Sequence, residues 1–377
     1  GRFTSPETML RQVRDGILDF IGAARPSIAD PFLPTKIRQG REDEIRECIG
    51  CNICRSSNNE AVPIRCTQNP AMGEEWRRGW HPERIATAAS RKKVLVVGGG
   101  PAGLEAAAAL GRRGYEVALA EAGRELGGRL LQESRLPGLS TWIRVRDHRQ
   151  LMLEKLAHVE IFRESAMTAD DILSFGADHV VLATGSRWRR DGIGIAGIRP
   201  VPISTDAVIA TPDELGTLSD LVLIYDDDHY FMGGALAEML SRAGHRVIYV
   251  TSNAIVSAWT QMTDEQYLVE ERLVGLGVEI RVSHTLRAIE GHRAIFAHAL
   301  SKGEAEIEAG TILLVTGRVP RDELAIELLA KTGAPSVTLI GDCLSPGLIA
   351  DAVYGGHRFA QEFEADVPPL RRERPEP

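Results

Sequence analysis

The sequence of 377 residues lacks the features of a membrane-spanning or nucleic-acid-binding protein. Glycines, Pro101 and Glu105 interrupt its most apolar stretch, 94–110, so no unbroken apolar run reaches the roughly 18 residues of a membrane-spanning helix. Lys and Arg number 44 against 52 Asp and Glu, and this net charge of −8 disfavours nucleic acid and anionic membranes as partners. No secretory leader is recognisable. We therefore expect a soluble, cytoplasmic protein that binds small molecules or other proteins.

Cysteine is also scarce, yet four of the five cysteines lie close together in the sequence, at Cys48, Cys51, Cys54 and Cys66. The pattern C-x2-C-x2-C-x11-C lets three thiolates wrap one corner of a cubane while the fourth arrives from a short loop, which predicts a [4Fe-4S] cluster. Zinc, which usually takes two separated C-x2-C pairs, and simple redox or structural thiols are the alternatives. The fifth cysteine, Cys343, is expected to be a small buried hydrophobic residue.

A glycine-rich motif, Gly98-x-Gly100-x-x-Gly103, follows an apolar strand and opens an alanine-rich helix. Such a turn lets the backbone approach a pyrophosphate at the N-terminus of the helix. Glu121 ends the next strand, where a carboxylate accepts a hydrogen bond from an adenosine ribose. The motif predicts nucleotide binding, the alternative being a turn kept only for packing. Residues 127–129, Gly-Gly-Arg, either approach the phosphates or are only structural.

An internal repeat relates two parts of the chain. The pattern Leu-x-Arg-x-Gly-x-x-Val at 110–117 recurs at 240–247, and Leu-Ala-Thr-Gly at 182–185 is echoed by Leu-Val-Thr-Gly at 314–317. Both pairs occur in the same order along the chain. We therefore predict two related Rossmann-like domains.

The second copy has lost the glycine motif. Its equivalents of Gly98, Gly100 and Glu121 are Asp228, Tyr230 and Thr251. Three acids at 226–228 would repel a pyrophosphate, and we expect them to cap a helix instead. The second domain is therefore predicted not to bind NAD(P)H.

The first 40 residues fit the end of a β/α barrel. Ser5 and Pro6 predict the start of a helix that closes at Gly16, and the apolar residues 17–21 predict a buried parallel strand that needs partner strands. Arg25 follows that strand, where a cation and a backbone nest hold a phosphate in such barrels. A surface salt bridge is the alternative role for Arg25.

The segments 22–32, 48–54 and 66–70 resemble the trimethylamine dehydrogenase group, flavin and iron–sulfur amine dehydrogenases related to old yellow enzyme and 2,4-dienoyl-CoA reductase. The resemblance implies an α/β fold with the last strands of a (β/α)8 barrel, an iron–sulfur connector and two Rossmann-like domains of the glutathione-reductase type. The implied limits are 1–40 for the barrel end, 41–90 for the cluster segment, 91–215 with 325–365 for the ADP- or FAD-binding domain, 216–324 for the degenerate NAD(P)-type domain and 366–377 for a tail.

The same resemblance implies three cofactors. Arg25, with the backbone at Gly22 and Ala24 and with Gly1 and Arg2 nearby, would hold the phosphate of an FMN shared with the absent part of the barrel. The four cysteines would hold the [4Fe-4S] cluster. Asp342 resembles the acid that approaches the flavin ribityl chain, so that FAD is an alternative to ADP. The residues assigned to this nucleotide are Gly98, Gly100, Ala102, Gly103, Glu121, Arg129, Thr184, Gly185 and Asp342.

The function implied is the electron-transfer portion of an N-methylamine dehydrogenase that carries out oxidative N-demethylation. Electrons would pass from FMN to the cluster and then to an electron-transferring flavoprotein. The remaining barrel would lie on the same or a companion chain, and the enzyme would be a homo-oligomer. Alternatives are an NAD(P)H-dependent enoate or 2,4-dienoyl-CoA reductase with FAD, and a binding scaffold without redox activity. We assign no catalytic residue, and the substrate amine is not identified.

Overall fold

The computed structural model describes residues 3–197, 199–301 and 303–366. Gly1, Arg2 and the expected tail from residue 367 onward lie outside the described residues. The chain divides into two compact units, the first Gly1–Arg135, Leu139–Gly185 and Pro320–Pro377, the second Leu136–Gly138 and Ser186–Val319. No helix among the described residues is long and apolar enough to cross a bilayer.

The N-terminal part of the first unit is made of short helices. The predicted first helix forms, because the side chain of Ser5 accepts from the backbone N–H of Thr8 and Pro6 occupies the first helical position. The helices are α1 (Pro6–Arg14), α2 (Ala24–Ala29), α3 (Leu33–Arg38), η1 (Glu42–Glu44), α4 (Ile53–Asn59) and α5 (Glu75–Arg78).

The prediction of a strand at residues 17–21 is wrong. These residues form bends and irregular backbone, and Ile17 and Phe20 are 62% and 82% exposed. A parallel strand exists only by pairing with neighbours, and no described residue pairs with this segment. The barrel strands expected within residues 1–40 are therefore not observed in residues 3–40.

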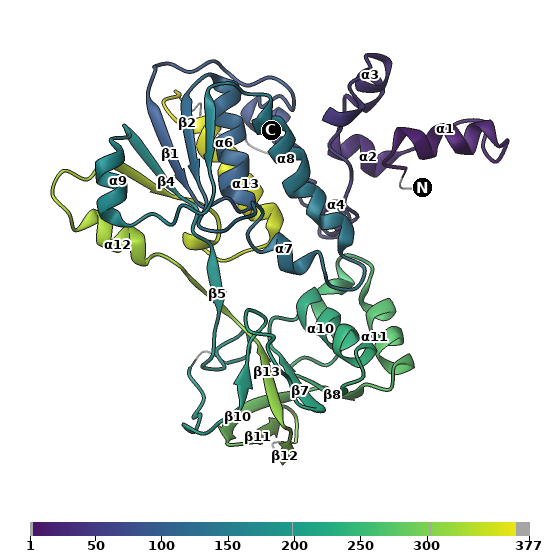
Figure 1. The fold of residues 1–377 in the computed structure, drawn as a ribbon. Helices are drawn as coiled ribbons and strands as arrows, with labels where there is room; N and C mark the ends of the chain where they lie inside the picture. The colour runs from purple at the N-terminus through teal and green to yellow at the C-terminus, as the bar shows by residue number, and fades with distance from the viewer. Residues whose placement is uncertain (1–2, 198, 302, 367–377) are drawn as a thin grey trace, which may run out of the picture. The chain divides into compact units, whose positions relative to one another are not determined.

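A parallel five-stranded sheet forms the centre of the first unit, in the order β15-β4-β1-β2-β3. Helices α6, α8 and α13 pack together on one face, and α9 and α12 pack on the other (Figure 1). The strands are β1 (Lys93–Val97), β2 (Glu116–Ala120), β3 (Val159–Phe162), β4 (His179–Leu182) and β15 (Ser336–Leu339). The helices are α6 (Pro101–Arg113), α7 (Leu130–Glu133), η2 (Ser140–Ile143), α8 (Arg144–Glu154), α9 (Ala169–Phe175), α12 (Glu323–Leu329), η4 (Gly341–Cys343) and α13 (Ile349–Glu362).

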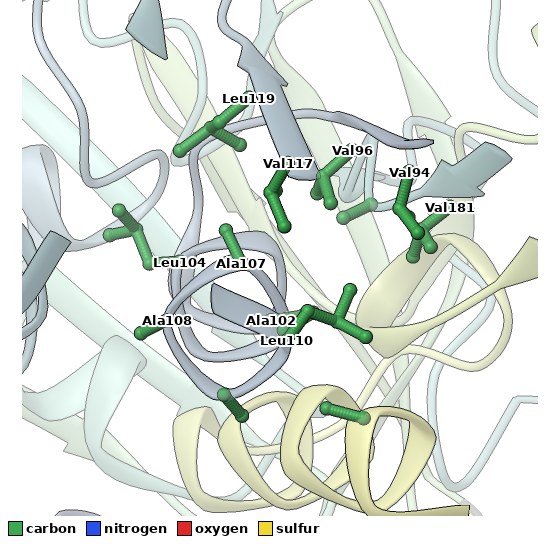
Figure 2. Close-up of a cluster of buried hydrophobic side chains, with 14 of the residues drawn as sticks. Val94, Val96, Ala102, Leu104, Ala107, Ala108, Leu110, Val117, Leu119 and Val181 are labelled. Atoms are coloured by element: carbon green, nitrogen blue, oxygen red, sulfur yellow. The ribbon is translucent and has the colours of Figure 1, made fainter. Parts of the chain in front are cut away.

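The alternation of side chains along β1 explains the two helical layers. Val94 and Val96 point toward α6, whereas Leu95 and Val97 belong to the cluster that includes residues of α9 and α12. Figure 2 shows α6 between the strands and α13, with small alanines such as Ala107 along it. Small side chains let the helix backbone approach both layers closely, and this places the N-terminus of α6 firmly at the carboxyl edge of the sheet.

The second unit repeats this plan. Its parallel sheet has the order β6-β13-β7-β8-β9, so that β13-β7-β8-β9 follows the connectivity of β4-β1-β2-β3. The internal repeat predicted from the sequence is therefore confirmed. Elements are β6 (Ile209–Ala210), β7 (Leu221–Asp226), α10 (Phe231–Arg242), β8 (Arg246–Thr251), η3 (Ala258–Gln261), α11 (Gln266–Gly275), β9 (Glu279–Arg281) and β13 (Thr311–Val315).

Two smaller sheets complete the fold. An antiparallel sheet of β10 (His284–Glu290), β11 (Arg293–His298) and β12 (Glu304–Glu308) adds to the core of the second unit, and β5 (Ser186–Trp188) pairs with β14 (Arg318–Pro320). The compact units divide beside β5 and β14, whereas the predicted domain limits lie at 215 and 325. Residues before 216 fall in the second unit because β6 pairs with β13.

Candidate nucleotide and cluster sites

The glycine-rich turn between β1 and α6 is closely packed. Gly98 has φ +109°, a conformation that L side chains rarely adopt, and a Cβ there would collide with the backbone oxygen of Ala183. A Cβ on Gly103 would collide with the carbonyl oxygen of Gly98. The turn therefore has the close helix–strand packing for which such glycines are required.

The N-terminus of α6 is open. Gly100 is its N-cap residue, no side chain caps it, and Pro101 occupies its first position. The free N–H groups of the first turn, which includes Ala102, and the positive end of the helix dipole suit a phosphate.

Glu121, directly after β2, lies beside this turn as predicted. Its Oε2 accepts from the N–H of Gly99 at 2.7 Å and its Oε1 accepts from the N–H of Gly123 at 2.7 Å. Each carboxylate oxygen can accept a second hydrogen bond, so Glu121 can still receive a ribose hydroxyl.

Gly127 and Gly128 pack against the turn, and their approach to a phosphate stays a prediction. The N–H of Gly127 donates to the carbonyl oxygen of Gly99 at 2.8 Å, and a Cβ on Gly128 would lie 3.1 Å from Cα of Gly100. The sequence analysis missed Gly341, where a Cβ would meet the Cβ of Ala102 at 2.6 Å. The only sequence signal for Gly341 was its position directly before Asp342, which was assigned to the nucleotide.

Arg129 and Asp342, assigned separately to the nucleotide, are brought together. Nη1 of Arg129 donates to Oδ2 of Asp342 at 2.9 Å and to the carbonyl oxygen of Gly347 at 2.9 Å. Nε of Arg129 donates to Oε1 of Glu133 at 2.5 Å. Burial opposes the charge on Arg129, but the two carboxylates raise the pKa of its guanidinium.

Thr184 and Gly185 lie behind the turn, after β4. The backbone N of Thr184 would be 3.3 Å from a Cβ on Gly98. The hydroxyl of Thr184 donates to the carbonyl oxygen of Arg321 at 2.6 Å, and the N–H of Arg321 donates to the carbonyl oxygen of Gly185 at 2.9 Å. These two residues shape the back of the turn.

The four clustered cysteines influence one another electrostatically. Burial raises the pKa of the Cys51 thiol to about 11 and that of Cys66 to about 12, and the neighbouring thiols add to both shifts. Cys48 contributes to both, and Cys54 contributes to the shift of Cys51. Sγ of Cys51 lies 3.2 Å from Oγ1 of Thr67.

A [4Fe-4S] cluster at these four cysteines stays a prediction. Among the described residues, no three Cys, His, Asp or Glu side chains converge on one metal position. A cubane spreads its four thiolates around a larger body, and thiolate is the ligand that iron–sulfur clusters use. Bound iron would favour the thiolate form of these cysteines and so oppose the rise in their pKa values.

The cysteine segment is fastened to α6, α8 and α13 by buried polar side chains. Gln68 accepts from Nη1 of Arg149 at 2.9 Å, Nε of Arg149 lies 2.6 Å from Oε2 of Glu105, and Nδ1 of His357 lies 2.8 Å from Oε1 of Glu105. Burial alone would raise the pKa of Glu105, but Arg149 and His357 lower it to about 2.

Arg25 contacts the cysteine loop. Its Nη1 donates to Oδ1 of Asn52 at 2.6 Å, and its charge acts on the thiol of Cys54. Asn52 adopts the left-handed conformation within the loop. Gly22 and Ala24 are exposed, and their role toward FMN, like that of Arg25, stays a prediction.

The prediction that the acids at 226–228 cap a helix is wrong. Helix α10 has Tyr230 as its N-cap residue and no side-chain cap. Oδ1 of Asp226 instead accepts from the N–H groups of Asp228 and His229, at 3.2 and 3.1 Å, because the carboxylate folds back into the turn.

These acids fill the turn of the second unit. A Cβ on Gly233 would lie 2.6 Å from Cγ of Asp226. Asp227 accepts from the N–H of Ala196 at 3.0 Å and from the hydroxyl of Ser252 at 2.6 Å. Carboxylates therefore stand where the first unit offers free amide groups to a phosphate.

Cys343 is 1% exposed and donates from its thiol to the carbonyl oxygen of Leu182 at 3.0 Å. The prediction that it is a small buried residue is confirmed.

Comparisons with known proteins agree with this geometry. Residues 92–356 match the family model described as pyridine nucleotide-disulphide oxidoreductase. The chain is 38% identical to dimethylamine dehydrogenase of Hyphomicrobium sp. (strain x), covering 99% of this chain and 56% of that protein.

Solved structures agree too. Histamine dehydrogenase from Rhizobium sp. 4-9 superposes with a TM-score of 0.95 at 47% identity, over 100% of this chain and 60% of that chain. The 6-hydroxypseudooxynicotine amine oxidase from Pseudomonas geniculata N1 gives 0.94 at 45% identity, over 97% and 56%. The chain thus spans little more than half the length of these relatives. It belongs to the pyridine nucleotide-disulphide oxidoreductase family and, within it, matches the C-terminal portion of the trimethylamine, dimethylamine and histamine dehydrogenase group.

Proposed function

We propose that the chain is the electron-transfer portion of an FMN- and [4Fe-4S]-containing N-methylamine dehydrogenase. The observation that carries this proposal is the cysteine loop, whose coupled thiols are fastened to the nucleotide-binding unit through Gln68, Arg149 and Glu105. The similarity to an enzyme named dimethylamine dehydrogenase supports the substrate class. A [4Fe-4S] cluster held here would supply one-electron transfer between the flavin and an electron-transferring flavoprotein.

The residues of this chain would hold and orient these groups. Cys48, Cys51, Cys54 and Cys66 would supply the four thiolates. Arg25 would lie between the flavin phosphate and the cysteine loop, because its guanidinium already binds Asn52 and has further donors. Gly22, Ala24, Gly1 and Arg2 would complete the FMN phosphate site.

The nucleotide of the first unit would be ADP. The open N-terminus of α6 would take the pyrophosphate and Glu121 the ribose. Loss of a phosphate site in the second unit favours ADP over FAD, because a working FAD in such enzymes exchanges electrons with a pyridine nucleotide. The predicted domains, 91–215 with 325–365 and 216–324, correspond to these two roles.

The assembly would include partners. The remaining barrel would lie on the same or a companion chain, the enzyme would be a cytoplasmic homo-oligomer, and its electron acceptor would be an electron-transferring flavoprotein. The alternative, an NAD(P)H-dependent enoate or 2,4-dienoyl-CoA reductase, requires the site that Asp226 and Asp227 fill.

The test compares Cys51→Ser with the control Cys343→Ser in the complete enzyme. We expect Cys51→Ser to lower the iron content and to abolish the EPR signal of the dithionite-reduced cluster and the transfer of electrons from dimethylamine to the flavoprotein. Cys343→Ser should leave all three unchanged, because Cys343 lies outside the cysteine loop and its thiol donates to the backbone oxygens of Leu182 and Ile340, which a serine hydroxyl can also do.

An unchanged iron content and EPR signal in Cys51→Ser would contradict the cluster assignment. Reduction of the wild-type enzyme by NADPH, at a rate that supports turnover of an enoate, would favour the reductase instead.

A further inference from the structure

The threonine that follows Cys66 places its hydroxyl against another of the four clustered cysteines. Oγ1 of Thr67 lies 3.2 Å from Sγ of Cys51, within hydrogen-bond distance for sulfur, although the two residues are 16 positions apart in the sequence. Thr67 is 2% exposed, so little water can compete for its hydroxyl. The contact therefore joins the segment of the fourth cysteine to the loop that carries the first three.

The segment that carries Thr67 is held in place by the two residues that follow it. Nε2 of Gln68 donates to the carbonyl oxygen of Glu47 at 3.1 Å, and Nδ2 of Asn69 donates to the carbonyl oxygen of Ile28 at 3.0 Å. Gln68 and Asn69 are each 1% exposed. Threonine is also branched at Cβ, which leaves its χ1 angle few alternatives. A fixed backbone and a stiff side chain thus present the hydroxyl to the cysteine sulfur.

The direction of this hydrogen bond follows from the chemistry of the sulfur. A free thiol can donate or accept, but a thiolate that ligates iron has no proton and can only accept. Thr67 would then be the donor, and its bond to a charged sulfur would be stronger than a bond to a neutral thiol. Hydrogen bonds to the ligand sulfurs are one of the factors that set the reduction potential of an iron–sulfur cluster.

The sign of the effect on the potential is set by charge. Reduction adds an electron to a cluster and makes its ligand sulfurs more negative. A donor aimed at one of these sulfurs therefore stabilises the reduced form more than the oxidised form, and this raises the potential. Backbone N–H groups act in the same way, for example that of Ile53 on Cys51. Thr67 differs from such backbone donors because a substitution can remove its hydroxyl.

We propose that Thr67 is a positioning residue that raises the reduction potential of the cluster through Cys51. Its hydroxyl donates to the Cys51 sulfur and so favours the transfer of one electron at a time from the flavin to the cluster over the reverse transfer. This inference rests on the proposed function, because it assumes that the four cysteines hold a [4Fe-4S] cluster.

The test is a redox titration of the complete enzyme, followed by the EPR signal of the reduced cluster. Thr67→Val removes the hydroxyl and keeps the branched shape, so we expect this variant to retain its iron and to have a lower midpoint potential. At a fixed potential, the ratio of reduced to oxidised cluster should fall by about tenfold, the equilibrium equivalent of one hydrogen bond, which corresponds to about 59 mV for a one-electron couple. Thr67→Ser keeps the donor and should lie closer to the wild type than Thr67→Val does.

Thr141→Val is the matched control. Oγ1 of Thr141 donates to the carbonyl oxygen of Ile49 at 2.9 Å, so this hydroxyl also binds the cysteine loop but meets a backbone oxygen instead of a sulfur. We expect Thr141→Val to keep the wild-type potential. Thr67→Ala serves as a second variant if valine prevents assembly of the cluster, because it removes the same hydroxyl without putting a methyl group in its place.

The outcomes separate the two proposals. A complete wild-type enzyme without iron, or without an EPR signal after reduction, would refute the cluster and with it the proposed function. A full cluster whose potential is the same in the wild type, Thr67→Val and Thr67→Ala would leave the proposed function standing and overturn the role of Thr67. Loss of iron from both variants, or an equal fall of the potential in Thr141→Val, would overturn it as well, because Thr67 would then only support the loop.

Discussion

At the residue scale, the glycine-rich turn depends on glycines because a Cβ atom would not fit at two of its positions. The carbonyl oxygen of Gly98 occupies the place of a Cβ on Gly103, and the backbone of Ala183 occupies that of a Cβ on Gly98. Both obstacles are backbone atoms, at the ends of β1 and β4, which cannot move without displacing these strands. The turn can therefore keep this close packing only while both positions are glycine.

We predict that Gly103→Ala abolishes nucleotide binding and lowers stability by about 1–3 kcal/mol, the usual cost of overpacking. Gly275→Ala is the control, because its Cβ would meet nothing within 4 Å. Alanine there should be neutral or stabilising by up to about 1 kcal/mol. The measurements are the nucleotide released per protein and the thermal unfolding midpoint. Full nucleotide content in Gly103→Ala would contradict the close packing.

Local spacing was enough to single out the clustered cysteines and the glycine turn as candidates, because each motif lies within one turn or loop. It could not predict that Arg129 pairs with Asp342, since 213 residues separate them and only the packing of Gly128 and Gly341 brings them together. The contact of Arg25 with Asn52 was hidden for the same reason.

At the scale of elements, α6 carries a buried charge in an otherwise apolar helix. Glu105 is 8% exposed and joins α6 to Arg149 of α8 and to His357 of α13. The same arginine holds Gln68, which lies two residues after Cys66. The Glu105 carboxylate thus links α6, α8 and α13 directly, and it links the cysteine segment to them through Arg149.

We predict that Glu105→Gln destabilises the protein by about 3–5 kcal/mol at neutral pH, because Arg149 would be left as a buried charge without its partner. The folded-state pKa of Glu105 is lowered to about 2, so its stabilisation is present above the ordinary value of 4.5 and is lost as the pH falls through about 2. Urea unfolding at several pH values should therefore show a weaker acid dependence in the variant.

Glu116→Gln is the control for this experiment, because its exposed side chain lies 3.8 Å from Lys93 and such surface pairs contribute little. Equal losses of stability in the two variants would contradict a special role for Glu105.

Asp226, in the turn between β7 and α10, should show the opposite pH dependence of stability to Glu105. Burial, together with Asp228, raises the pKa of Asp226 to about 6 against the hydrogen bond from Tyr249. The folded state therefore binds this proton more tightly than the unfolded chain, and the associated stability is present below about 3.8 and lost as the pH rises through about 6.

We predict that Asp226→Asn is more stable than the wild type at about pH 8, by up to about 3 kcal/mol, and that the difference disappears near pH 4. The amide oxygen can still accept from the N–H groups of Asp228 and His229. Thermal unfolding across this pH range is the measurement, with exposed Asp220→Asn as the control. A difference that is independent of pH would show that the Asp226 charge is not its source.

At the scale of the whole molecule, the sequence allowed the two repeated sheets to be predicted but not the structure of the first 40 residues. The repeats are visible because apolar strands and glycine turns recur at a fixed offset, and each sheet closes on strands of the same unit. Residues 17–21 have the composition of a buried strand, but strand formation requires partners that the described residues do not supply. Composition alone cannot decide whether such a segment forms a strand.

The two units also make a thermodynamic prediction, since the nucleotide residues all lie in the first unit and the filled turn lies in the second. ADP at about one hundred times its dissociation constant stabilises the structure that binds it by about 2.7 kcal/mol. We therefore expect calorimetry to resolve two transitions, of which ADP raises one and NADPH raises neither. Glu105→Gln should lower the ADP-sensitive transition, and Asp226→Asn should raise the other at about pH 8. If ADP shifted both transitions equally, the units would unfold as one cooperative block, and a shift by NADPH would mean that the carboxylates of Asp226 and Asp227 do not exclude a dinucleotide.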